Sequence, residues 1–210
     1  MAKVNLNEKE REEISRAIEN AESKTSGEIV PVILNASDHY PGARWRIATS
    51  IALLLGLITM LIKPDLSGLY LLVALCLYVL IGHLLATFPR LLRLALIGRE
   101  IDEEVQQKAY ESFMQLNLHR TKDRTGILIF VSMLEHRIMV VADSGINDVA
   151  PENYWQEVVA VLSARIRSGE LASGLCEAIT LCGELLEEKF PITEDDQNEL
   201  KNTVILEEDL

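Results

Sequence analysis

The chain is dominated by an apolar stretch from Ile47 to Leu85 that is interrupted once. The interruption is Lys-Pro-Asp-Leu-Ser-Gly at residues 63–68, where proline and glycine favour a tight turn. The two halves, residues 47–62 and 69–85, are predicted to be helices about 25 Å long, because an α-helix rises about 1.5 Å per residue. Neither half keeps a polar face at helical spacing, as a helix packed on a soluble core normally does.

These halves are predicted to form a transmembrane hairpin, near the lower length limit for crossing a hydrocarbon core of roughly 30 Å. Arg44, Arg46 and Lys63 can extend the hydrophobic length because their long side chains reach the headgroups. Trp45 stands where an interfacial aromatic anchor is expected. A buried hairpin of a soluble protein and a re-entrant segment are the alternatives.

The charged flanks predict the orientation of the hairpin. The loop between its helices holds one basic residue, Lys63. The flanking segments hold Arg44, Arg46, Arg90, Arg93 and Arg99. The positive-inside rule therefore places both flanks in the cytoplasm. After Pro89 the sequence RLLRLALIGRE predicts a helix that lies at the headgroup surface, with arginines on one side and leucines on the other.

The rest of the chain has the pattern of a soluble α/β domain. A helix is predicted from about Asn7, with Glu10 as its capping-box partner, and a buried strand over residues 28–34. The hairpin is followed by a helix at residues 101–118, strands at 127–132 and 137–142, and two amphipathic helices. The crossover between the first two strands makes them parallel, and the short turn makes the third antiparallel. The predicted fold is a small α/β/α sandwich interrupted by a two-helix transmembrane hairpin.

This organisation divides the chain into four parts. Residues 1–42 hold the first helix and strand, and residues 43–89 the transmembrane hairpin. Residues 90–191 complete the α/β domain, and residues 192–210 are expected to be an acidic, disordered tail.

Composition excludes several classes of function. The net charge is -12, so the protein is expected to repel nucleic acid. The three cysteines show neither a disulfide framework nor metal-ligand spacing. The sequence has no phosphate-binding loop, dinucleotide fingerprint or His-Glu-x-x-His motif, which excludes the common enzymes built on them.

Three aspartates are the candidate site residues, because Asp38, Asp123 and Asp143 all lie in loops where strands begin or end. If they converge, their oxygens could hold Ca²⁺ or Mg²⁺, and the metal could activate water against a phosphoester. The alternative is that each aspartate caps its own turn, as this residue commonly does. No cofactor is expected. Calcium or magnesium could bind only if these three aspartates converge.

The order of several motifs resembles the TPM-domain family. They are a first helix leading into TSGEIVPVIL, then RTGILIFVSMLEHRIMVVADSGI, then Trp-x-x-Val-Val and a closing AIxxCGxLL helix. The resemblance covers about Asn5 to Pro191, with the hairpin as an insertion of the bacterial membrane-inserted type. It implies an α/β/α sandwich. The family includes thylakoid-lumen and photosystem II repair proteins; some members are described as acid phosphatases, with calcium binding, and others act in the assembly or repair of membrane complexes.

Two family motifs are altered in this chain. The family's Asp-Asn-Gly before a strand resembles Asp123-Arg124-Thr125-Gly126, with Asp123 shifted by one residue. Its Gly-Tyr-Gly-Leu-Glu turn resembles Asp143-Ser144-Gly145-Ile146, which lacks the first Gly, the Tyr and the Glu. We therefore favour a non-catalytic adaptor in the assembly or maintenance of an envelope membrane complex, with the lipid bilayer and other membrane proteins as partners. The alternative is a membrane-tethered, metal-dependent acid phosphatase.

Overall fold

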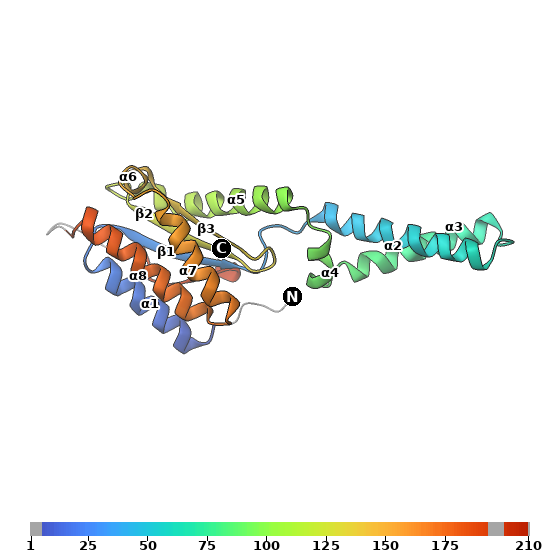
Figure 1. The fold of residues 1–210 in the computed structure, drawn as a ribbon, viewed down its shortest axis with the longest axis horizontal. Helices are drawn as coiled ribbons and strands as arrows, with labels where there is room; N and C mark the ends of the chain where they lie inside the picture. Colours follow the sequence, from blue (N-terminus) through green and yellow to red (C-terminus); the bar gives the residue numbers. More distant parts are fainter. Residues whose placement is uncertain (1–5, 193–199, 210) are drawn as a thin grey trace. The chain divides into compact units, whose positions relative to one another are not determined.

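The computed structural model describes residues 6–192 and 200–209 (Figure 1). The described chain forms two compact units. One is Asp38–Glu103, which contains the apolar hairpin, and the other is built from the chain before and after it.

The second unit is organised around a four-stranded sheet with the order β3-β2-β1-β4. The strands are β1 (Glu28–Leu34), β2 (Gly126–Ser132), β3 (Arg137–Ala142) and β4 (Ile205–Leu206). β1 runs parallel to β2, and β2 runs antiparallel to β3. Both predicted pairings are confirmed. They arise because a long crossover joins the first pair of strands and a tight turn joins the second.

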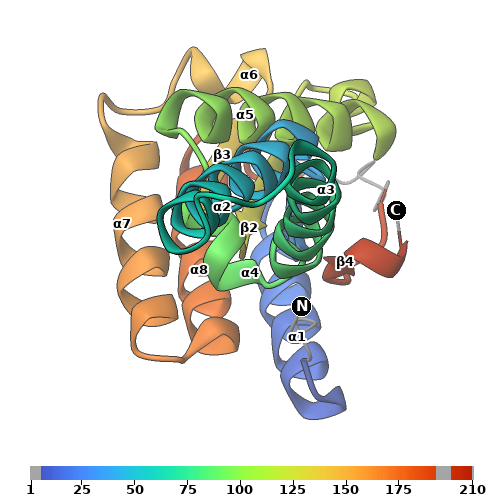
Figure 2. The same ribbon diagram turned by 90° about the vertical axis from the view of Figure 1, so that its right-hand side faces the viewer.

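Helices cover both faces of this sheet (Figures 1 and 2). One face carries α1 (Glu8–Glu22), α7 (Tyr154–Arg167) and α8 (Leu171–Lys189). The other carries the later part of α5 (Gly98–Gln115). The predicted α/β/α sandwich is confirmed.

Burial explains why β1 and β2 are central. Every residue of both strands is buried, as expected for strands covered on two faces. Alternate β1 residues such as Ile29 and Ile33 enter the core with Ile14 and Ile18 of α1. The predicted capping box begins α1, since Glu10 N–H donates to the Asn7 side chain at 3.0 Å and Asn7 N–H donates to Glu10 at 2.8 Å.

The hairpin unit consists of α2 (Pro41–Ile62), α3 (Gly68–Leu85) and the short α4 (Pro89–Leu94). α2 begins earlier than predicted, at Pro41, because proline suits the first turn of a helix. Both long helices are long and apolar enough to cross a membrane, and most of their large apolar side chains are exposed.

Small residues hold α2 and α3 close together. A Cβ on Gly82 would lie 2.7 Å from Ala48 Cα, so only glycine permits this approach of the two backbones. Further along the hairpin, the hydroxyls of Thr59 and Tyr78 are hydrogen-bonded at 2.9 Å. The hairpin therefore pairs two of its polar side chains internally and presents apolar ones outward.

The C-terminal segment differs from the expected disordered tail. Residues 200–209 include β4, which pairs in parallel with Val32 and Ile33 of β1, and the 3₁₀ turn η2 (Glu207–Asp209). Val204 and Leu206 are buried in the core of the domain. Two apolar side chains and one free strand edge therefore outweighed the acidic composition that predicted disorder. Residues 193–199, also assigned to the tail, lie outside the described residues.

Candidate functional site

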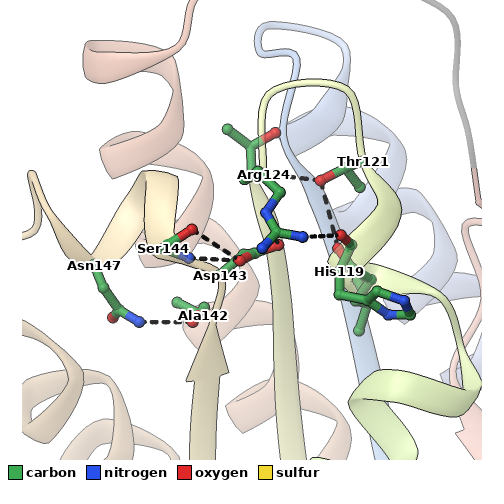
Figure 3. Close-up of polar contacts among 9 residues, drawn as sticks. His119, Thr121, Arg124, Ala142, Asp143, Ser144 and Asn147 are labelled. Atoms are coloured by element: carbon green, nitrogen blue, oxygen red, sulfur yellow. Dashed lines mark hydrogen bonds and ion pairs between the residues drawn. The ribbon is translucent and has the colours of Figure 1, made fainter.

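The candidate site lies at the end of the sheet where β2 begins and β3 ends (Figure 3). Ile127 pairs with Ala142 in the antiparallel ladder, which brings the loop before β2 beside the turn after β3. The loop contains the 3₁₀ turn η1 (Leu118–Arg120), and the turn continues into the short α6 (Ser144–Asn147). Two segments quoted for the TPM resemblance therefore meet here.

The loop before β2 is held by its own hydrogen bonds. Arg124 N–H donates to Thr121 O at 3.1 Å, and Thr125 N–H donates to the Thr121 hydroxyl at 3.0 Å. Arg124 adopts a left-handed conformation with φ of 58°. Its guanidinium also donates to the carbonyl of His119 at 2.6 Å. These contacts fix the direction of the Arg124 side chain, which points toward the turn after β3 (Figure 3).

Asp143 is the buried carboxylate of the site, with 7% of its surface exposed. Its Oδ1 accepts from the N–H of Ser144 at 2.6 Å and from the Ser144 hydroxyl at 3.2 Å. Its Oδ2 forms an ion pair with Arg124 Nε at 3.5 Å. The carboxylate therefore caps α6 and is neutralised by a guanidinium of its own chain.

Gly145 allows α6 to approach the loop. A Cβ at this position would lie 2.7 Å from Asp123 O and 2.8 Å from Arg124 O. Backbone oxygens cannot move aside as the end of a long side chain can, so only glycine fits here. Asn147 completes the attachment, because its Nδ2 donates to Ala142 O at 2.6 Å and its Oδ1 accepts from Trp155 Nε1 at 3.1 Å.

The structure brings together two of the three predicted aspartates. Asp143 and the backbone of Asp123 belong to this site, whereas Asp38 follows β1, whose chain leaves the sheet at the opposite end because β1 is parallel to β2. There Asp38 accepts from Tyr40 N–H at 2.8 Å and caps its own turn. Among residues 6–192 and 200–209, no group of three or more His, Cys, Asp or Glu side chains is placed to hold a metal ion. A metal site at these aspartates stays a prediction.

The role of Arg124 was missed by sequence reasoning. The available signal was the departure from the family's Asp-Asn-Gly, which puts an arginine between Asp123 and the strand. The ion pair itself could not be read from the sequence, because Arg124 and Asp143 meet only through the β2–β3 pairing.

Other carboxyls outside this site are also shielded from solvent: Glu28 and Glu135 are buried, and Glu22 is partly buried. Glu135, between β2 and β3, accepts hydrogen bonds from the Ser132 hydroxyl and from Ser37 N–H, the latter at 2.9 Å. Glu22, at the end of α1, accepts from Ile29 N–H at 2.9 Å. Burial is the main cause that raises the pKa of Glu22 to about 8, and the nearby charge of Glu28 adds to it.

The cysteines of the α/β unit are poorly suited to nucleophilic chemistry. Burial raises the pKa of the Cys182 thiol to about 12 and also raises the pKa of Cys176. Since the thiolate is the nucleophile, both cysteines are predominantly protonated and unreactive near neutral pH.

The fold defines the class of protein as an α/β/α domain with an apolar helical hairpin inserted after its first strand. Residues 91–185 match the family model of the TPM domain. This match confirms the resemblance to the TPM domain that the sequence predicts, over residues 91–185. The match includes both loops of the candidate site, whereas α1 and β1 lie outside it.

The fold also resembles that of a solved bacterial protein. The NMR structure of BA42 protein from the psychrophilic bacterium Bizionia argentinensis superposes with a TM-score of 0.61 at 22% sequence identity. The similarity covers 98% of this chain and 99% of that protein. At this identity the likeness shows the fold alone. No curated protein sequence matches the chain.

Proposed function

We propose that the protein is a membrane-anchored TPM-domain adaptor, without catalysis of its own, that acts in the assembly or maintenance of an envelope membrane complex. The observation that carries this proposal is the pairing of Asp143 with Arg124 at 3.5 Å. A divalent cation at Asp143 would have to displace that guanidinium, which is held in place by the carbonyl of His119. The family position best suited to metal chemistry is therefore used by an ion pair.

The exposed hairpin supports the membrane part of the proposal. Leu53, Leu61 and Leu69 are among its large apolar side chains that are more than two-thirds exposed, a degree that is costly in water and favourable in lipid. The arginines on both flanks favour a cytoplasmic TPM domain under the positive-inside rule. Other membrane proteins are the expected partners.

Cysteine labelling tests the orientation. In a background carrying Cys76→Ala and Cys176→Ala, a membrane-impermeant maleimide added to intact cells should label Ser67→Cys in the hairpin loop. It should miss Ser168→Cys, an exposed position between α7 and α8, until the cells are opened. Labelling of Ser168→Cys alone in intact cells would invert the orientation.

Thermal unfolding tests the absence of a metal site. A cation bound at 100 times its Kd would stabilise the fold by about 2.7 kcal/mol. We expect calcium and magnesium to shift the unfolding temperature of the wild-type protein no more than that of the Asp143→Asn variant. The reason is that Arg124 already neutralises Asp143. A calcium-dependent rise of several degrees, abolished by Asp143→Asn, would contradict the ion-pair interpretation and favour an enzyme.

One observation favours the alternative, a membrane-tethered, metal-dependent acid phosphatase. The carbonyl oxygens of Asp123 and Arg124 both face Gly145, close to where Asp143 begins α6. Carbonyl and carboxylate oxygens are the ligands that Ca²⁺ takes in proteins. This alternative requires Arg124 to swing away from Asp143.

Capture of partners and an assay of hydrolysis distinguish the two functions. The intact protein, extracted in mild detergent after cross-linking in its own membranes, should retain a reproducible set of membrane proteins. Tyr110 and Met114 lie one turn apart on α5 and are 48% and 55% exposed, so Tyr110→Ser with Met114→Ser should reduce that capture. The exposed Gln107→Ser is the matched control.

Phosphoester hydrolysis that depends on calcium or magnesium and on Asp143 would refute the adaptor.

A further inference from the structure

The segment that follows the hairpin combines positive charge with exposed apolar side chains. We call residues 88–99 the α4 collar. From residue 66 to residue 99 the chain contains three arginines, all in the collar, and no aspartate or glutamate. The whole chain carries a net charge of -12, so this basic stretch runs against the general composition. The excess is confined to the collar, because Glu100, Asp102, Glu103 and Glu104 follow it directly. Within the collar it favours a negatively charged partner.

The collar presents its arginines and its apolar residues outward together. Leu92 is buried and attaches α4 to the rest of the hairpin unit. Arg90 and Arg93 are exposed on the same short helix. Leu94, the residue after Arg93, is 83% exposed, and Ile97 is 51% exposed. Exposed leucine and isoleucine beside arginine are typical of a segment that lies in a membrane interface.

Contacts with α2 fix the depth of the collar. The guanidinium of Arg46 donates to the Glu100 carboxylate at 2.8 and 2.6 Å and to the carbonyl of Ala95 at 2.9 Å. The neighbouring Trp45 packs against His83 of α3, with ring centroids 5.4 Å apart. The collar is therefore held at the level of Trp45, where an amphipathic aromatic ring marks the boundary between headgroups and hydrocarbon.

We propose that the α4 collar binds the phosphate groups of anionic phospholipids in the leaflet at the Trp45 end of the hairpin. Arg90 contacts the phosphates, while Leu94 and Ile97 enter the upper acyl region. The arginine guanidinium is suited to this role because its planar fork donates two parallel hydrogen bonds to phosphate. No carboxylate of the described chain forms an ion pair with Arg90, whereas Arg99 is paired with Glu103 at 2.7 Å. The inference rests on the membrane anchoring proposed above and is independent of the adaptor role.

The test uses the intact protein in mild detergent, titrated with short-chain phosphatidylglycerol or phosphatidylcholine and followed by thermal unfolding. Phosphatidylglycerol should bind more tightly than phosphatidylcholine. Each arginine near a membrane surface contributes about fivefold to the binding of anionic lipid, so Arg90→Gln should weaken it by about that factor. Arg90→Gln together with Arg93→Gln should weaken it further, and Leu94→Ser should weaken both lipids. Lys63→Gln, in the loop at the far end of the hairpin, is the matched control and should change nothing.

Several outcomes would overturn the inference. Equal affinity for the two lipids, or phosphatidylglycerol binding that Arg90→Gln and the double variant leave unchanged, would show that the collar does not recognise the phosphate. The same shift in unfolding temperature with inorganic phosphate alone would show that the collar binds a free anion and does not require a lipid. A protein released from membranes by alkaline carbonate, without detergent, would instead refute the anchoring itself, so the two failures are distinguishable.

Discussion

Glu22→Gln is expected to stabilise the α/β domain by about 3–4 kcal/mol at pH 8 and by less than about 1 kcal/mol at pH 5. Burial at the end of α1 raises the pKa of Glu22 to about 8, helped by the charges of Glu28 and Glu19. Glutamine resembles the protonated acid, and its oxygen can still accept from Ile29 N–H. The variant therefore keeps the favourable contact and removes the ionisation.

The direction of the pH dependence follows from proton linkage. A folded-state pKa above the unfolded value means that the native state binds more protons between pH 4.5 and about 8. The stability that protonated Glu22 contributes is fully present below pH 4.5 and is lost as the pH rises through about 8. In this window the free energy of unfolding should fall by up to about 1.4 kcal/mol per pH unit.

Urea unfolding of the intact protein in mild detergent, followed by circular dichroism from pH 5 to 9, measures this slope. Glu19→Gln is the matched control, because Glu19 is exposed on the same helix. Its removal relieves only a minor part of the repulsion, so the slope should persist. A wild-type profile that is flat over this range, or one that Glu22→Gln leaves unchanged, would show that Glu22 is ionised in the folded protein.

Leu206→Ala is expected to destabilise the domain by about 2–3 kcal/mol, although it lies near the end of an acidic segment. Leu206 is 5% exposed, and β4 attaches it to the edge of β1 beside Ile33. Truncating a buried leucine removes its transfer free energy and leaves a cavity, which costs about 2–5 kcal/mol in protein cores. We expect the lower part of this range because β4 is a two-residue strand at the edge of the sheet, which can relax more easily than a central strand.

The adjacent residue provides the control for this experiment. Ile205 points to the other side of β4 and is only partly buried, so Ile205→Ala should cost less than about 1 kcal/mol. Chemical denaturation midpoints of the two variants measure the difference. If both variants had equally small effects, residues 200–209 would not be packed on the domain, as the acidic composition predicted.

Local patterns determined most of the fold from the sequence alone. The capping box of Asn7 and Glu10, the period-two and fully apolar strands, and the turn at residues 133–136 all depend on neighbouring residues. The parallel pairing of β1 with β2 followed from a crossover rule that needs only the order of elements. The apolar hairpin could also be predicted from its own residues. A helix that is apolar on every side lies either in the core of a large protein or in a membrane.

Contacts between distant segments were decided only by the tertiary structure. β4 finds the free edge of β1, so two buried side chains offset the acidity of their neighbours. The sequence allowed Asp38 to converge with Asp123 and Asp143 because all three flank strands, but strand direction sends Asp38 away from the other two. Arg124 reaches Asp143 through the antiparallel ladder of β2 and β3. The partial burial of Glu22 depends likewise on how α1 packs beside the start of β1. Composition and periodicity report what each segment prefers by itself, whereas charge pairing and burial depend on which segments the sheet brings together.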